Sequence, residues 1–135
     1  MLPDKLKLEI ITPLKKIYAA DVSSIRLPGA EGYLGIYPGH TPYLVTLKIG
    51  EIKVVNGKET QYFATSGGFA EISPGSVSVL AETAEPAPEI DVKRARDAEQ
   101  RAEKRLGEEP KNWDVMRARI GVTRAMNRLQ VASRR

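Results

Sequence analysis

The sequence predicts an α+β protein, in which an N-terminal antiparallel β-sandwich or barrel (residues 1–85) precedes a C-terminal two-helix hairpin (residues 86–135). Two observations predict the first part: short runs alternate apolar and polar residues, and glycine, proline or asparagine separates them. A third marks the boundary, because two prolines in three residues (86–88) stop strands and stiffen a linker. Beyond them the apolar residues recur at helical spacing.

The predicted strands lie between turn signals about 8–12 residues apart, as in antiparallel sandwiches and barrels. LKLEI (6–10) alternates strictly, and VSSIRL (22–27) ends at a Pro-Gly pair. Asn56-Gly57 separates two strand-like runs and predicts a type I′ hairpin turn, since both residues tolerate positive φ. The tetrapeptide at 73–76 predicts the next turn. Ser66-Gly67-Gly68 has no helix after it and predicts a bend between strands.

Two helices are predicted after the prolines. Asp91 is a suitable N-cap for the first helix and Gly107 ends it, whereas Asn112 can cap the second after a turn at Glu109-Pro110. The two apolar stripes consist of Ala95, Ala98, Ala102 and Leu106 in the first helix, and of Val115, Ala118, Val122, Ala125, Met126 and Leu129 in the second.

These stripes offer mostly methyl groups. Burial stabilises by about 25 cal/mol per Å² of apolar surface, so alanine contributes little against the entropy cost of ordering the chain. Gly121 inside the second helix costs about 1 kcal/mol more relative to alanine. We therefore expect a mobile hairpin that can dock, detach or extend; a permanently docked helical pair is the alternative.

Charge divides unevenly between the two parts. Residues 1–84 contain eight basic and eight acidic residues, whereas residues 85–135 contain thirteen basic and nine acidic ones, so the helical part carries the whole net charge of +4. A basic segment is either a solvated face or a contact with an acidic protein, nucleotide or nucleic acid. The sequence has no cysteine, which excludes disulfides and cysteine-ligated zinc. We expect neither a signal peptide nor a membrane span.

No enzyme motif is present, and we expect a non-catalytic protein without cofactor or metal. His40, in YPGHTP, is the sole histidine, and a loop position that faces backbone or a protein partner explains it better than catalysis. The glycine-rich PGAEGYLG lacks the lysine and hydroxyl residue of a P-loop.

Arginines follow one face of each predicted helix. Arg94, Arg101 and Arg105 are spaced by 7 and 4 residues, and Arg117, Arg124, Arg128 and Arg135 by 7, 4 and 7. Facing stripes would repel each other unless an anion or neighbouring carboxylates lay between them. Arg124 and Arg128, one turn apart, suit a phosphate chain. Glu85 and Asp91 precede the first helix and could accept from a ribose hydroxyl or an adenine amino group. Exposed arginines that serve only solubility are the alternative.

Several motifs together resemble the epsilon subunit of F-type ATP synthase, of the bacterial, Bacillus-like kind. GYLGIYPGHTPYLVTLKIGEI (32–52) carries that family's G-x-x-G-x-x-P-G-H-x-P pattern, and TSGGFAEI (65–72) its S-G-G-F. VSVLAETAE (77–85) and RAMNRLQVA (124–132) add to the similarity. The hairpin opens with I-D-x-x-R-A, here Ile90, Asp91, Arg94 and Ala95. The resemblance covers nearly the whole chain in the right order.

This resemblance implies a sandwich of about ten strands that binds the gamma subunit and the c-subunit ring in the central-stalk rotor, on the cytoplasmic face of the bacterial cell membrane. The membrane would be reached only through the complex. Extended helices would approach the catalytic beta subunits and inhibit ATP hydrolysis, and ATP as a regulatory ligand would stabilise the folded hairpin. The nucleotide-binding residues implied are Glu85, Asp91, Arg94, Ala95, Arg124 and Arg128, and the subunit-interface residues are Glu31, Tyr33 and His40.

Tyr33 departs from the family, because relatives often carry Glu or Gln at this loop position; an aromatic ring here supplies packing instead of charge. The rival function is a basic helical nucleic-acid-binding module. Against it stand the acidic residues interspersed in the helices and the absence of an aromatic stacking platform, so no nucleic-acid partner is expected.

Overall fold

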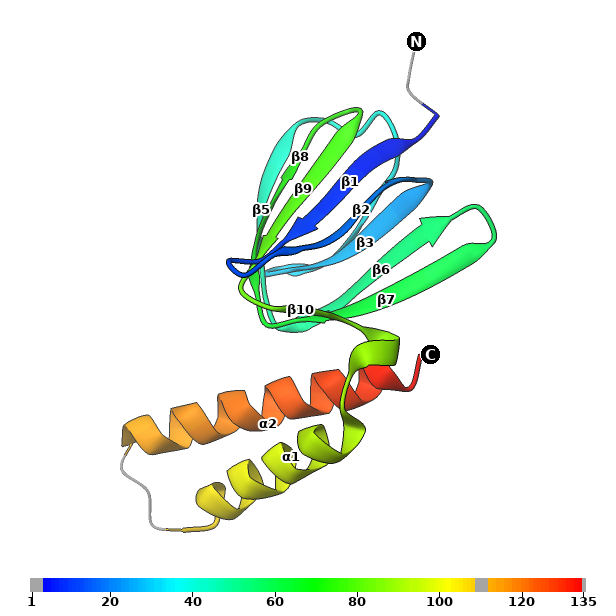
Figure 1. Cartoon of the computed structure of the whole chain (residues 1–135). Coiled ribbons are helices and arrows are strands. Elements are labelled where there is room, and N and C mark those ends of the chain that lie inside the picture. The colour runs from blue at the N-terminus through cyan, green and yellow to red at the C-terminus, as the bar shows by residue number, and fades with distance from the viewer. Residues whose placement is uncertain (1–3, 109–111, 135) are drawn as a thin grey trace. The chain divides into compact units, whose positions relative to one another are not determined.

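A computed structural model describes residues 4–108 and 112–134, with residues 112–114 described by backbone alone. The chain divides into two compact units, Met1–Pro86 and Ala87–Arg135, one residue beyond the boundary expected from the sequence. The first unit contains ten strands and the second contains two α-helices, which confirms the predicted α+β class. Figure 1 shows these elements along the chain. The strands are β1 (Leu6–Ile11), β2 (Lys16–Val22), β3 (Ser24–Gly29), β4 (Gly32–Ile36), β5 (Tyr43–Leu47), β6 (Gly50–Asn56), β7 (Glu59–Thr65), β8 (Gly68–Ile72), β9 (Ser76–Ala81) and β10 (Ala84–Pro86).

The strands form one hydrogen-bonded sheet in the order β10-β7-β6-β3-β5-β8-β9-β1-β2, with β4 added to β3. All pairs are antiparallel except β1 and β9, which are parallel. The predicted antiparallel sandwich of about ten strands is confirmed, and the β1–β9 pair is the one parallel pairing in the described part of the chain. Alternation along a strand reports which face is buried and says nothing about the direction of its neighbour.

A single core shows how the sheet curls. Leu8 of β1, Ile25 of β3, Ile52 of β6 and Phe63 of β7 are almost fully buried in one hydrophobic cluster, although β1 is far from the other three strands in the sheet order. A flat sheet could not bring these side chains together, so the sheet folds back on itself and encloses them, as Figure 1 shows. The alternating sequence pattern predicts this inward-facing set.

The β6–β7 turn differs from the predicted type I′ turn. Asn56 pairs with Glu59, so the two loop residues are Gly57 and Lys58. Gly57 has φ +64°, and no non-glycine residue of the described chain has positive φ. Positive φ at the first loop residue alone is the pattern of a type II′ turn, which needs glycine at that position. The strand thus extends one residue further than predicted.

The proline segment is also more ordered than a simple linker. Pro86 pairs with Phe63 in β10, the last strand of the sheet order. An edge strand tolerates a residue without an N–H. Ala87–Glu89 then form a single 3-10 turn, labelled η1. The prolines therefore end the sheet and begin the second unit within four residues.

The hairpin consists of α1 (Val92–Leu106) and α2 (Asn112–Ala132). The predicted caps are confirmed at α1: the Asp91 Oδ1 accepts from the Arg94 N–H at 3.0 Å, and Gly107 is the C-cap residue. The predicted turn at 109–110, the Asn112 side-chain cap and Arg135 lie outside what the structure describes. Among the described residues neither helix has the length and apolar character needed to cross a bilayer.

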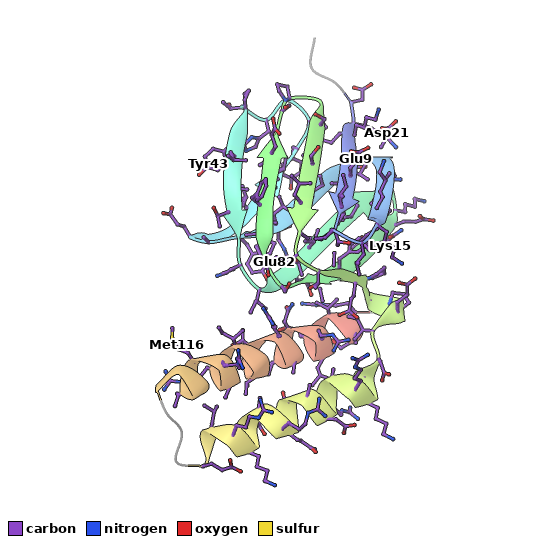
Figure 2. All side chains as sticks on the ribbon, turned by 60° about the vertical axis from the view of Figure 1, so that its left-hand side comes forward. Glu9, Lys15, Asp21, Tyr43, Glu82 and Met116 are labelled. Atoms are coloured by element: carbon purple, nitrogen blue, oxygen red, sulfur yellow. The ribbon has the colours of Figure 1, made fainter. Side chains whose placement is uncertain are left out.

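Alanine dominates the buried face of the hairpin. The buried set is Ala95, Ala102, Ala118, Ala125, Val131 and Ala132. Two predicted stripe members are wrong, since Leu106 is 36% exposed and Met126 56% exposed. Because alanine is small, the two helices lie close together. Longer side chains at the edges of each apolar stripe do not fit between the helices and remain exposed to solvent. Met116 projects from α2 away from α1 (Figure 2).

Candidate functional site

A cavity of about 480 Å³ lies between α1 and α2. Its charged lining residues are Arg101 and Arg105 of α1 and Arg117 and Arg124 of α2, and the remaining lining residues are Ala98, Ala102, Ala118, Ile120 and Gly121. Among the described residues no carboxylate lines it, and none forms a salt bridge with Arg101, Arg105 or Arg124. The two predicted arginine stripes therefore do meet, and the cavity is suited to an anion.

The packing of the hairpin explains why the arginines converge. A Cβ added at Gly121 would lie 3.3 Å from the Ala102 Cβ, so the two helices pack closely at this level. Arg101 and Arg105 flank Ala102 along α1, and Arg117 and Arg124 flank Gly121 along α2. No large side chain keeps the helices apart at this level, and these four arginines line the cavity between them.

Helix geometry also places the other two arginines. The Ala102–Gly121 contact fixes the register, so Arg94 lies near the level of residue 129 and thus beside the level of Arg128. At 1.5 Å per residue this level is about 12 Å along the hairpin from the Ala102–Gly121 contact. The arginines of both helices therefore extend from the cavity toward the start of α1, over roughly 16 Å from Arg105 to Arg94.

The predicted nucleotide-binding residues are only partly brought together. Arg124 alone of the six lines the cavity. Asp91 caps α1, and Ala95 is fully buried in the hairpin, so its methyl group packs between the helices. Glu85 is half-buried on β10 opposite Ala64, in the other unit. Conversely, Arg101, Arg105 and Arg117 line the cavity although the predicted set omits them; their spacing in the arginine stripes was the available signal.

The β3–β4 turn forms a second candidate site. Gly29 pairs with Gly32, so Ala30 and Glu31 are the two turn residues, and Glu31 is exposed at the tip. The Ala30 N–H donates to the Thr46 carbonyl at 2.8 Å, which ties the turn to β5. Glu31 and Tyr33 line a cavity of about 450 Å³ between this turn and β5. Tyr43, another lining residue, projects outward from β5 (Figure 2).

His40 lies elsewhere, after the opposite end of β4. Its N–H donates to the Tyr37 carbonyl at 3.2 Å, and Gly39 has φ +89°. With Pro38 before that glycine, this is the arrangement of a type II turn. The His40 Nδ1 lies 2.6 Å from the Thr41 carbonyl oxygen, so Nδ1 carries the proton. The structure thus brings together Glu31 and Tyr33 of the predicted interface set, and leaves His40 apart from them.

Beside the β3–β4 turn, a polar cluster lies on β3, β4 and β6. An Arg26 Nη2 is 2.6 Å from the Glu51 Oε1, and the side chain of Glu51 is only 6% exposed. The Tyr33 ring lies beneath the Arg26 guanidinium, with 5.1 Å from the guanidinium carbon to the ring centroid. Sequence reasoning missed this ion pair, because the two residues are 25 positions apart and no local pattern links them.

No group of three or more metal-ligating side chains occurs among residues 4–108 and 112–134. Neither candidate site therefore contains the chemistry of a metal centre. What the two sites offer is recognition: an anion-binding cavity in the hairpin, and a tight acidic turn beside aromatic side chains in the sandwich. The chain is thus an α+β protein with one candidate recognition site in each of its two units.

Comparisons with known proteins give the family. Residues 5–87 match the family described as "ATP synthase, Delta/Epsilon chain, beta-sandwich domain", and residues 89–133 match "ATP synthase, Delta/Epsilon chain, long alpha-helix domain". The ATP synthase epsilon chain of Syntrophobacter fumaroxidans is 44% identical over 97% of this chain and 98% of its own. Those of Halalkalibacterium halodurans and Bacillus pumilus are 43% and 41% identical, each over 96% of this chain and 98% of their own.

The chain therefore belongs to the ATP synthase delta/epsilon chain family, and the resemblance to epsilon subunits is confirmed. Solved structures share the fold. A chain of the Euglena gracilis mitochondrial ATP synthase matches with a TM-score of 0.86 at 22% identity, over 100% of this chain and 84% of its own. A chain of the Tetrahymena thermophila enzyme matches with a TM-score of 0.66 at 18% identity, over 98% of this chain and 99% of its own.

Proposed function

We propose that this protein is the epsilon subunit of a bacterial ATP synthase and works in its central stalk, where it couples proton translocation to ATP synthesis without catalysing a reaction itself. The sandwich binds the gamma subunit and the c-subunit ring. The complex is thereby held at the cytoplasmic face of the cell membrane. Relatives named as ATP synthase epsilon chains, matched along nearly their full length, support this role.

The hairpin regulates the complex in this proposal. Folded, it permits ATP hydrolysis; extended toward the catalytic beta subunits, it inhibits. Alanine methyl groups provide most of the buried contact between α1 and α2, so the folded hairpin buries little apolar surface. The free-energy difference between the folded and the extended hairpin is therefore small. A ligand that binds only the folded hairpin shifts the balance by its binding free energy.

ATP is the proposed ligand of the folded hairpin. The observation that carries this proposal is the cavity lined by four arginines, with no carboxylate among its described lining residues. A triphosphate would neutralise like charges that otherwise repel across the gap, and each guanidinium can donate two parallel hydrogen bonds to it. Arg94 and Arg128 lie further along the same faces, on the side of the Asp91 cap, where the ribose and adenine would extend.

Titration calorimetry of the full chain with ATP tests the ligand. Arg124→Ala plus Arg128→Ala should weaken binding by about tenfold or more, because charge-assisted hydrogen bonds contribute about 1.5–3 kcal/mol each. The matched control is Arg96→Ala plus Arg119→Ala, which removes the same charge from exposed positions outside the cavity. No heat at millimolar ATP, or equal weakening in both double variants, would remove the site.

Hydrolysis assays test the regulatory role separately. Added to an epsilon-depleted ATP synthase, the full chain should lower ATP hydrolysis, and a chain that ends at Pro86 should bind without inhibiting. This end point keeps β10 in the sheet. Unchanged hydrolysis with the bound full chain would refute inhibition by the hairpin, whereas failure of the shortened chain to bind would refute docking through the sandwich.

A further inference from the structure

The strand that carries the β3–β4 turn is held from one side. In the described part of the chain, β4 pairs with β3 alone. Its register places Tyr33 opposite Pro28, next to the Gly29–Gly32 pair that closes the turn. The Pro28 carbonyl accepts from the Lys48 N–H at 2.9 Å and so faces away from β4, and this pair exchanges no ladder hydrogen bond. This end of β4 can therefore gain a further attachment from a side chain.

The Tyr33 side chain supplies that attachment. It crosses from β4 to β6, where its hydroxyl oxygen accepts from the Glu51 N–H at 3.0 Å. The ring lies under Arg26 of β3, and the Lys48 Nζ is 6.0 Å from the ring centroid. Two cations near one ring, together with a hydrogen bond at its far end, restrict both the tilt and the reach of the side chain.

The surroundings are shaped to fit this position. A Cβ added at Gly50 would lie 2.5 Å from the Pro28 Cβ and 2.9 Å from the Tyr33 hydroxyl oxygen. Glycine at position 50 is thus what lets the tyrosine hydroxyl approach the β6 backbone. Because Tyr33 is still 51% exposed, only part of its surface is used for this attachment, and its other part lines the cavity beside Glu31.

We propose that Tyr33 is the positioning residue of the docking turn: by fastening β4 to β6 it holds Ala30–Glu31 where Glu31 meets the partner subunit. This inference rests on the proposed binding of the sandwich to its partner subunits, with Glu31 at the interface as the family resemblance implies. In this proposal Tyr33 does not contact the partner directly. An aromatic residue can therefore occupy a position where relatives often carry Glu or Gln.

The first test is amide exchange of the free full chain. Tyr33→Phe keeps the ring under Arg26 and removes only the hydroxyl acceptor. Exchange should accelerate by about tenfold at Glu51 and across residues 30–32, as expected for loss of one hydrogen bond. Tyr37→Phe, at an exposed tyrosine outside the cavity, is the matched control and should change neither. Unchanged exchange at residues 30–32 in Tyr33→Phe would overturn the positioning role.

The second test is a double-mutant cycle on binding to epsilon-depleted ATP synthase. Tyr33→Phe and Glu31→Gln should each weaken binding several-fold, and the double variant should bind no more weakly than Glu31→Gln alone, because Tyr33 acts through Glu31. Independent, multiplying losses would show that Tyr33 contacts the partner itself and would overturn the inference. So would normal binding of Glu31→Gln. If the unaltered chain does not bind, the proposed function itself fails.

Discussion

Gly121 sets the distance between the helices, and Gly121→Ala should open the hairpin. The added methyl group would lie 3.3 Å from the Ala102 Cβ, closer than ordinary carbon–carbon contact, and both atoms are attached directly to helix backbone. Neither can rotate away, so the helices must separate by a few tenths of an ångström. Most of the other buried residues of α1 and α2 are also alanines, which cannot extend to fill the space that this opens.

The magnitude follows from two opposing effects. Alanine favours helix over glycine by about 1 kcal/mol, but α2 gains this in the docked and undocked hairpin alike, so it cancels. Overpacking costs about 1–3 kcal/mol and applies to the docked hairpin only. We therefore expect a shift of about 5–150-fold toward the undocked hairpin. ATP affinity should fall if ATP binds the docked form.

Spin labels measure this opening directly. Gln100 and Thr123 are exposed and lie at the same level of the hairpin, and the chain has no cysteine, so Gln100→Cys plus Thr123→Cys gives one defined pair. Gly121→Ala should broaden the distance distribution, and Ala102→Gly added to it should restore the short distances by removing the opposing methyl group. A narrower distribution in Gly121→Ala, or no rescue by Ala102→Gly, would refute the reasoning.

Three further predictions concern charge and capping. Without ATP, raising the salt from 0.1 to 1 M should shorten the distance between the same spin labels, because the screening length falls from about 10 Å to about 3 Å and the arginines repel less; lengthening would contradict this. Asp91→Ala should destabilise α1 by about 1 kcal/mol and accelerate amide exchange at Arg94, whereas Asp91→Asn should retain the cap; equal exchange in both variants would show that the cap is unimportant. Burial, and secondly the negative charge of Glu59, raises the pKa of Tyr18 above 10.0. As the pH rises past about 10, Tyr18 therefore ionises in the unfolded chain before it ionises in the folded protein. The free energy of unfolding falls over this range until the pH passes the pKa of Tyr18 in the folded protein. Tyr18→Phe should flatten this alkaline loss in thermal melts, and an unchanged slope would count against it.

The sequence determined the elements of each unit because their signals are local. Alternation marked the strands, Asp91 and Gly107 marked the ends of α1, and alanine at helical spacing marked the face that the helices share. Even the arginine cavity was partly predictable, since spacings of 7 and 4 residues place side chains on one face. Local sequence also predicted where the glycine-containing turns lie. The exception is the β6–β7 turn, where the pairing of Asn56 with Glu59 shifts the loop by one position to residues 57–58.

Only the tertiary structure decided which distant residues meet. The parallel pairing of β1 with β9, the Arg26–Glu51 ion pair and the hydrogen bond from the Glu51 N–H to Tyr33 all join segments whose local patterns carry no information about each other. The same holds in the hairpin, where the Ala102–Gly121 contact fixed the register and thereby selected Arg105 and Arg117 for the cavity. Local periodicity specifies a face, but the facing partner depends on how the whole chain packs.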